Sequence, residues 1–202
     1  MLGSVEQLAN YPLSVDGAIT RLFRSVGVRD FAGAARHVLH LPYGRIKDRA
    51  QFWLVLKEGR GTCTTKHALL AELAREQAID LELMLGIYEM GERNTPGVGG
   101  VLRKYGLPYV PEAHCYLRYH GVRIDVTGVP PGAEPFERFL YEEPITVEKI
   151  GAYKNDLHKR FLHDWIARTE TVQGRSLDDV WRIREECIAA LGAGEYAQQE
   201  GG

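Results

Sequence analysis

Residues 114–127 constrain the fold more than any other stretch, because they read as two short strands joined by a two-residue turn. The turn is His120-Gly121, and the runs on either side alternate apolar and polar side chains. Pairing Tyr119 with Val122 puts the apolar side chains of both runs on one face. A slip of one residue would destroy this agreement, so the pattern predicts one register for an antiparallel hairpin.

The same register gathers the polar side chains of the hairpin on the opposite face. These side chains are His114, Tyr116, Arg118, Arg123, Asp125 and Thr127. His114 and Asp125 become diagonal neighbours, with Cβ atoms about 7–8 Å apart. An imidazole and a carboxylate at that separation can form a hydrogen bond. Cys115 falls on the apolar face and is predicted to be a core residue.

A second informative feature is the junction Gly61-Thr62-Cys63, where a glycine-broken loop runs into a strong helix pattern. The pattern that follows is apolar over a broad face, which predicts a central buried helix. The first turn of a helix offers N–H groups and a partial positive charge, and both favour a thiolate over a thiol. Cys63 is therefore placed to react, although a free cysteine taken alone is more often a small core residue.

A cysteine nucleophile needs a lowered pKa, a base within hydrogen-bond reach and a group that orients the base. Cys63 at a helix start meets the first need. His114 is the candidate base, and Asp125 is the group that would hold its ring. Acyl chemistry also needs oxyanion donors. The backbone N–H of Cys63 is one candidate donor, and the side chains of Gln51 and Trp53 are the upstream candidates for the second.

Three of these motifs together resemble a known superfamily. They are Gly61-Thr62-Cys63 opening a helix, His114-Cys115-Tyr116 opening a strand, and Asp125-Val126-Thr127 after a short turn. They are similar to the G-x-C, H-x-aromatic and D-x-T marks of the transglutaminase-like superfamily, over about residues 50–130. The resemblance implies an α+β fold with a papain-like core, in which a central Cys-bearing helix packs on a small antiparallel sheet. It does not extend to the flanking helices.

The superfamily includes protein crosslinkers, peptide N-glycanases and bacterial cysteine peptidases or amidases. The resemblance implies that Cys63 is the nucleophile, His114 the general base and Asp125 the orienting acid. The expected reaction is hydrolysis or acyl transfer on an amide in a peptide or peptide-like substrate, through a thioester. The alternative is a catalytically silent member of the fold that serves as a binding or scaffold module, because neither Gln51 nor Trp53 matches the spacing of the family's oxyanion-assisting side chain.

His67 lies four residues after Cys63, on the same helix face. The favoured interpretation puts His67 at the rim of the site, for which Tyr116 is also a candidate, and an alternative makes His67 a second base. A third interpretation is a zinc site made by Cys63, His67, His114 and Cys115. The hairpin register turns Cys115 away from His114, so neither a metal nor another cofactor is predicted.

Helical patterns flank the core on both sides. The expected helices cover 14–26 (capped by Ser14), 30–40, 47–57, 63–78, 147–170 and 176–191, with a strand at 81–90, a stiff turn at 128–132 and a frayed polar tail at 193–202. Glycines and prolines in 91–111 predict a long functional or mobile loop. We expect one domain over 1–202. Its core covers about 47–132, with helical parts at 14–46 and 146–192.

Composition and charge argue against nucleic acids and membranes as partners. The net charge of −2 lacks the basic footprint of a nucleic-acid binder, and no apolar run reaches the ~18 residues of a membrane span. The start of the chain lacks a signal-peptide pattern. The three cysteines do not have the spacing of a disulfide framework, and Cys187 is predicted to be core. We therefore expect a cytoplasmic protein without nucleic-acid or membrane partners. The C-terminal helices could also form the interface of a homodimer, which is the one protein partner considered.

Overall fold

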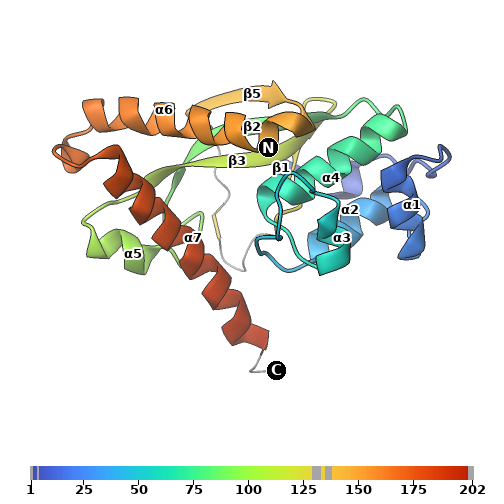
Figure 1. The fold of residues 1–202 in the computed structure, drawn as a ribbon, viewed down its shortest axis with the longest axis horizontal. Coiled ribbons are helices and arrows are strands. Elements are labelled where there is room, and N and C mark those ends of the chain that lie inside the picture. Colours follow the sequence, from blue (N-terminus) through green and yellow to red (C-terminus); the bar gives the residue numbers. More distant parts are fainter. Residues whose placement is uncertain (1, 4, 129–132, 135–137, 200–202) are drawn as a thin grey trace. The chain divides into compact units, whose positions relative to one another are not determined.

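The described chain holds one five-stranded sheet (Figure 1). The computed structural model describes residues 2–3, 5–128, 133–134 and 138–199. Its strands are β1 (Leu2–Gly3), β2 (Glu82–Met90), β3 (Val110–Tyr119), β4 (Val122–Ile124) and β5 (Tyr141–Ile145). Their order is β1-β4-β3-β2-β5, in which four strands are antiparallel and β1 adds to β4 in parallel. The predicted α+β class with a small antiparallel sheet is confirmed, and the papain-like core stays a prediction.

Helices make up the larger share of the structure. They are α1 (Ala18–Ser25), α2 (Phe31–His40), α3 (Leu54–Glu58), α4 (Cys63–Glu76), α5 (Gly99–Lys104), α6 (Ala152–Arg168) and α7 (Leu177–Gln199). Short 3-10 turns are η1 (Val5–Gln7), η2 (Val147–Ile150) and η3 (Glu170–Val172). Among the residues described, no helix has both the length and the apolar character that a membrane crossing requires.

The chain divides into two compact units. The first comprises Met1–Gly86, His114–Gly128 and Glu142–Gly151, and the second comprises Ile87–Ala113, Val129–Tyr141 and Ala152–Gly202. Strands β2 and β3 each contribute residues to both units. The residues of the predicted Cys–His–Asp site all belong to the first unit, so the site can be described within that unit alone. The expectation of a single domain over 1–202 stays a prediction.

The hairpin of β3 and β4 has the predicted register. Tyr119 pairs with Val122 and Leu117 with Ile124, in antiparallel orientation. The turn residues His120 and Gly121 have φ values of 48° and 78°. A two-residue turn with positive φ at both positions matches the twist of the flanking strands, which explains why the turn forms at this sequence. Cys115 is fully buried, as its place on the apolar face predicted.

Helix α4 is the element around which the helices of the first unit pack. It contacts α1, α2, α3 and η2. Leu69, Leu70 and Leu73 on α4 are fully buried, which confirms the predicted central helix. The helix begins after Thr62, whose N–H donates to Oγ1 of Thr65 at 3.0 Å. This bond is one half of a capping box and fixes Cys63 in the first turn.

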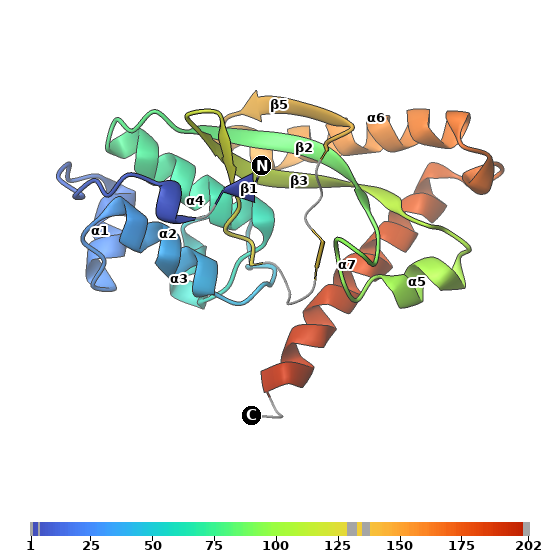
Figure 2. The same cartoon turned by 180° about the vertical axis from the view of Figure 1, so that it is seen from behind.

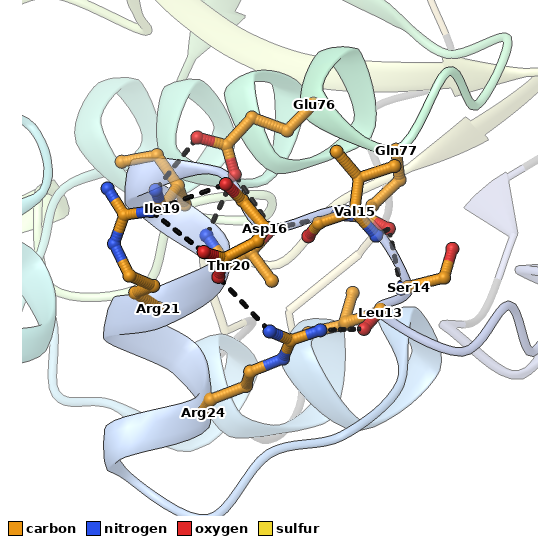
Figure 3. Close-up of polar contacts among 10 residues, drawn as sticks. All are labelled: Leu13, Ser14, Val15, Asp16, Ile19, Thr20, Arg21, Arg24, Glu76 and Gln77. Carbon is orange, nitrogen blue, oxygen red and sulfur yellow. Dashed lines mark hydrogen bonds and ion pairs between the residues drawn. The ribbon is translucent and has the colours of Figure 1, made fainter.

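Helix α1 begins later than the predicted cap Ser14, because another element caps it. Glu76, the last residue of α4, accepts from the N–H groups of Ile19 and Thr20, each at 2.8 Å (Figure 3). A carboxylate here satisfies N–H groups of the first turn and complements their partial positive charge. On α1, Ile19 is buried, whereas Leu22 is 37% exposed.

Two other predicted helices are interrupted. The helix expected at 47–57 is reduced to α3, because the Asp48 side chain accepts from the N–H of Ala50 at 2.9 Å and favours a turn over a helix. The helix expected at 147–170 breaks at Gly151, whose φ of −91° and ψ of −110° are not helical. The part of the predicted helix before the break is η2, and the part after it is α6.

The C-terminal third and the glycine-rich segment are more ordered than predicted. The segment 91–111 contains α5, before which the Glu92 carboxylate accepts from backbone N–H groups of Gly97 and Gly99. Helix α7 extends to Gln199, past the predicted frayed tail from 193, because that stretch is rich in helix formers. The predicted turn at 128–132 lies outside the described residues, apart from its first.

The second unit has its own hydrophobic core. Helix α7 contacts both α5 and α6 (Figure 2). Leu162 of α6 and Ile183 of α7 are fully buried, and so is Cys187. This burial confirms the predicted place of Cys187 in the core, and it raises the pKa of the thiol to about 11, which leaves the thiol unreactive.

Candidate active site

Cys63 is the first residue of α4. It is 8% exposed, and its Sγ lies 3.8 Å from the hydroxyl of Thr64. The N–H groups of a first helical turn point toward the helix N-terminus and carry a partial positive charge. A thiolate at this position is stabilised by that charge. The local sequence therefore puts the thiol in the electrostatic setting that its position predicted.

His114 and Asp125 meet across the hairpin. His114 Nε2 donates to Asp125 Oδ2 at 2.6 Å, and both side chains are nearly buried, at 9% and 7% exposure. The other carboxylate oxygen, Oδ1, accepts from the N–H of Thr127 at 2.7 Å. The contact predicted from the hairpin register is therefore present. Both oxygens of the carboxylate have a donor, which fixes its orientation.

Cys63 and His114 are electrostatically coupled. Burial alone would lower the pKa of His114, but the charges of Asp125 and Cys63, with hydrogen bonds to both, outweigh burial and raise it to about 10. Because Nε2 is bonded to Asp125, Nδ1 is the ring nitrogen that can face the thiol. The coupling is mutual, so an imidazolium here favours the thiolate form of Cys63. The three side chains thus form one connected line.

Asp125 keeps its negative charge in this buried setting. Burial would raise the pKa of its carboxyl group, but His114 outweighs burial, with contributions from His67 and Thr127, and holds the pKa well below its usual value. An ionised carboxylate beside an imidazolium is a stable pair even where water is largely excluded. The line therefore holds a carboxylate and an imidazolium next to the thiol at neutral pH.

His67 is fully buried rather than at the predicted site rim. Its Nδ1 lies 2.6 Å from the carbonyl oxygen of Cys63, and its Nε2 accepts from the N–H of Val126 at 2.8 Å. Burial lowers the pKa of His67 to about 4, with Asp125 acting in the opposite direction. The segment that follows β4 covers this face of α4, where the N–H of Val126 meets the ring. Both ring nitrogens are engaged by the backbone, so His67 is poorly suited to act as a second base.

Lys66 directly precedes His67 on α4 and contacts loop segments that neighbour the helix. It is fully buried, and its Nζ donates to the carbonyl oxygens of Leu41 at 2.5 Å and Thr127 at 3.0 Å. A third carbonyl oxygen, that of Leu39, lies at 3.5 Å.

The two candidate oxyanion side chains lie at and just before the start of α3. Gln51 is exposed, and its amide donates to the carboxylate of Asp48 at 3.0 Å. Trp53 is 39% exposed and packs edge-on against Phe52. Both residues lie in the stretch where the turn at Asp48 replaces the start of the predicted helix. These contacts hold both side chains against their neighbours in the sequence, and their role as oxyanion donors stays a prediction.

Tyr116 is buried instead of lining a rim. Its hydroxyl donates to Glu142 at 2.9 Å, and the guanidinium of Arg123 lies 5.0 Å from its ring. Burial, with the hydrogen bond to Glu142, raises the pKa of Tyr116 to about 12. Tyr116 therefore stays protonated and holds β3 to β5, a structural role within the first unit.

The zinc interpretation is not supported by how these residues are arranged. Both nitrogens of His67 are engaged by backbone groups, and His114 Nε2 is engaged by Asp125. In the residue ranges that the structure describes, no group of three or more potential ligand side chains is arranged to hold a metal ion. The chemistry that fits the arrangement is that of a nucleophilic thiol with an acid–base partner.

Comparisons with known proteins do not identify the chain. No family model, no curated protein and no solved structure matches it. The assignment of function therefore rests on the line from Cys63 through His114 to Asp125.

Proposed function

We propose that the protein is a cysteine-dependent amide hydrolase or acyltransferase, with Cys63 as nucleophile, His114 as acid–base and Asp125 as the group that orients His114. The observation that carries the proposal is the 2.6 Å bond from His114 to Asp125, joined to the coupling of His114 with the thiol of a helix N-terminus. This combination supplies an activated nucleophile, a proton donor and an orienting carboxylate.

The reaction proceeds in two halves. The Cys63 thiolate attacks the carbonyl carbon of the amide, and the carbonyl electron pair moves to oxygen. When this tetrahedral intermediate collapses, the C–N bond breaks, and the proton on His114 Nδ1 passes to the leaving amine. A thioester remains on Cys63. Water or a second amine then attacks the thioester while His114 takes its proton, which regenerates the thiolate and releases an acid or a new amide.

Asp125 stabilises the imidazolium of the first half and keeps Nδ1 directed at the sulfur. The first-turn N–H groups of α4 are the donors best oriented toward an oxyanion beside Cys63. The resemblance to the transglutaminase-like superfamily is in keeping with these roles. It extends the proposal to a papain-like core, a peptide or other amide-containing substrate and a cytoplasmic location.

A catalytically silent binding or scaffold module is the second candidate. It is favoured by one observation, which is that the Gln51 amide is bonded to Asp48 and the Trp53 ring packs on Phe52. Without a side-chain donor, oxyanion stabilisation would rest on the backbone. The two candidates differ in one measurable property, because only the enzyme forms and resolves a thioester on Cys63.

Acylation by p-nitrophenyl acetate tests the proposal. We expect a burst of p-nitrophenol equal to the enzyme concentration, with the acetyl group mapped to Cys63 by mass spectrometry and then lost with time. Cys63→Ala should abolish the burst. Cys115→Ala is the matched control at a buried cysteine and should retain it. If wild-type Cys63 is not acetylated, or is acetylated without turnover, the silent module is the better account.

A further inference from the structure

His67 connects helix α4, which carries Cys63, to the segment after β4, which carries Asp125. Its Nδ1 lies 2.6 Å from the carbonyl oxygen of Cys63, and its Nε2 lies 2.8 Å from the N–H nitrogen of Val126. Cys63 opens helix α4, and Val126 directly follows Asp125 in the chain. One fully buried side chain therefore joins the residue of the nucleophile to the residue beside the orienting acid.

The two backbone partners fix the tautomer of this ring. A carbonyl oxygen can only accept, so Nδ1 carries the proton, and the N–H of Val126 can only donate, so Nε2 presents its lone pair. Asp125 Oδ1 lies farther from Nε2, at 3.4 Å. A proton on Nε2 would turn it toward Asp125 and break the bond to Val126. The lowered pKa of His67, about 4, agrees with a neutral ring at pH 7.

Lys66 fastens the same segment from the preceding position of α4. Its Nζ donates to the carbonyl oxygen of Thr127 at 3.0 Å, while the N–H of Thr127 donates to Asp125 Oδ1 at 2.7 Å. The segment from Asp125 to Thr127 is thus bonded to α4 at two successive residues. Movement of this segment would carry Asp125, and with it His114, away from the thiol.

We propose that His67 is a positioning residue of this site, which sets the distance between the Cys63 thiol and the His114–Asp125 pair by joining the Cys63 carbonyl to the Val126 N–H. The inference rests on the proposed function. His67 acts through other groups and does not touch the reacting atoms. A misplacement of about 1 Å in such a site can lower a rate by about 100-fold, so a fixed bridge has a direct chemical consequence.

Two variants separate the two ends of the bridge. His67→Asn keeps an N–H near the position of Nδ1 and loses the acceptor for Val126, whereas His67→Gln keeps an acceptor near the position of Nε2. Glu76→Gln is the matched control, because it weakens a cap at the opposite end of α4. The readout is the rate of Cys63 alkylation by iodoacetamide as a function of pH, mapped by mass spectrometry. A purely structural residue would not move this pH profile in a folded protein.

We expect His67→Asn to raise the pH midpoint of alkylation by at least about one unit, which corresponds to about tenfold slower reaction at pH 6. His67→Gln should lie between that variant and the wild type, and Glu76→Gln should match the wild type. A folded His67→Asn protein with the wild-type profile would overturn the inference. Nitrogen NMR of wild-type protein adds a test that needs no variant: we expect the neutral Nδ1–H tautomer at pH 7, and an Nε2–H tautomer or an imidazolium would also overturn it.

The alkylation profiles separate a failure of the positioning role of His67 from a failure of the proposed function. If wild-type Cys63 reacts with the midpoint of an ordinary thiol, the proposed function fails. If wild-type Cys63 reacts at low pH and the His67 variants leave its profile unchanged, the function stands and only the positioning role of His67 is lost.

Discussion

Replacing Asp125 with Asn removes one charge from the centre of the site with little change in shape. The amide oxygen of Asn can still accept from the N–H of Thr127, which donates to Asp125 at 2.7 Å. The amide can also keep a hydrogen bond to His114, which lies 2.6 Å from the present carboxylate. What is lost is the charge of the acceptor. His114 then faces burial without a carboxylate, and its pKa falls.

The loss of stability in Asp125→Asn follows from the hydrogen bond between His114 and Asp125. A hydrogen bond to a charged group contributes about 1.5–3 kcal/mol, and a neutral one about half as much. The loss is therefore about 1–2 kcal/mol. Because His114 and Asp125 are only 9% and 7% exposed, solvent screening reduces this little. For a chain of this length each kcal/mol shifts the Tm by about 2–4 °C, so we expect the Tm to fall by about 2–8 °C near pH 6.

The sign of the pH dependence can be worked out for each partner. The pKa of His114 is raised from 6.5 to about 10, so its stabilising contribution is complete below pH 6.5 and is lost as the pH rises toward 10. The pKa of Asp125 is lowered from 3.8, so its contribution is present above that value and is lost in acid. The difference between wild type and Asp125→Asn should be largest between about pH 4 and pH 6.5.

Thermal unfolding followed by circular dichroism across this pH range is the assay. Asp16→Asn is the control, because Asp16 pairs with Arg21 on the surface with 64% of its side chain exposed. We expect that control to change stability by less than about 0.5 kcal/mol. A Tm difference for Asp125→Asn that is absent at pH 6, or equally large at pH 10, would refute the charged-pair reasoning.

Three further substitutions test other parts of the structure. Lys66→Met leaves the carbonyl groups of Leu41 and Thr127 without the Lys66 donor, at up to about 1–3 kcal/mol each, so the urea midpoint should fall, and an unchanged midpoint would contradict a stabilising role for the buried Lys66. Glu76→Gln should weaken the α1 cap by about 0.5–1 kcal/mol, seen as faster amide hydrogen exchange in the first turn of α1, and equal exchange rates would speak against capping by charge. Gly61→Ala puts a Cβ 2.9 Å from Lys66 Cγ and 3.0 Å from a methyl carbon of Val55; we expect about 1–3 kcal/mol of destabilisation by calorimetry, and a neutral effect would show that these neighbours yield freely.

The hairpin and helix α4 could be predicted because their signals are local. Alternation along two short runs fixes a register, and His120-Gly121 suits the positive φ values that the turn requires. Thr62 before an apolar helix pattern gives the start of α4. These elements carry Cys63, His114 and Asp125, which is why the contact between the last two could be derived from residue order alone.

Features that no local apolar pattern reveals account for most of the wrong predictions of secondary structure. The cap of α1 is Glu76, more than fifty residues along the chain from Ile19 and Thr20, and no pattern around Ser14 reveals it. The strand β5 is largely exposed and polar, so its sequence carries no apolar alternation. The turn at Asp48 depends on one side-chain bond that competes with a plausible helix pattern.

The roles of the residues that support the site could not be predicted for a related reason. The spacing from Cys63 to His67 correctly put them on one helix face, but the role of His67 depends on the backbone of Val126, which lies in the segment after β4. Lys66 likewise bonds carbonyl groups of two distant segments. Spacing in a sequence identifies which side chains share a face, and only the packed structure shows which backbone groups they meet.

The pH profile of Cys63 alkylation, measured for wild type and for His114→Ala, tests the central claim most directly. An ordinary thiol has a pKa near 8.5 and is almost entirely protonated at pH 6. The line from Cys63 through His114 to Asp125 predicts that wild-type Cys63 reacts at pH 6 on the order of 100-fold faster than Cys63 in the His114→Ala protein. Equal rates at pH 6, with both midpoints near that of an ordinary thiol, would contradict the account.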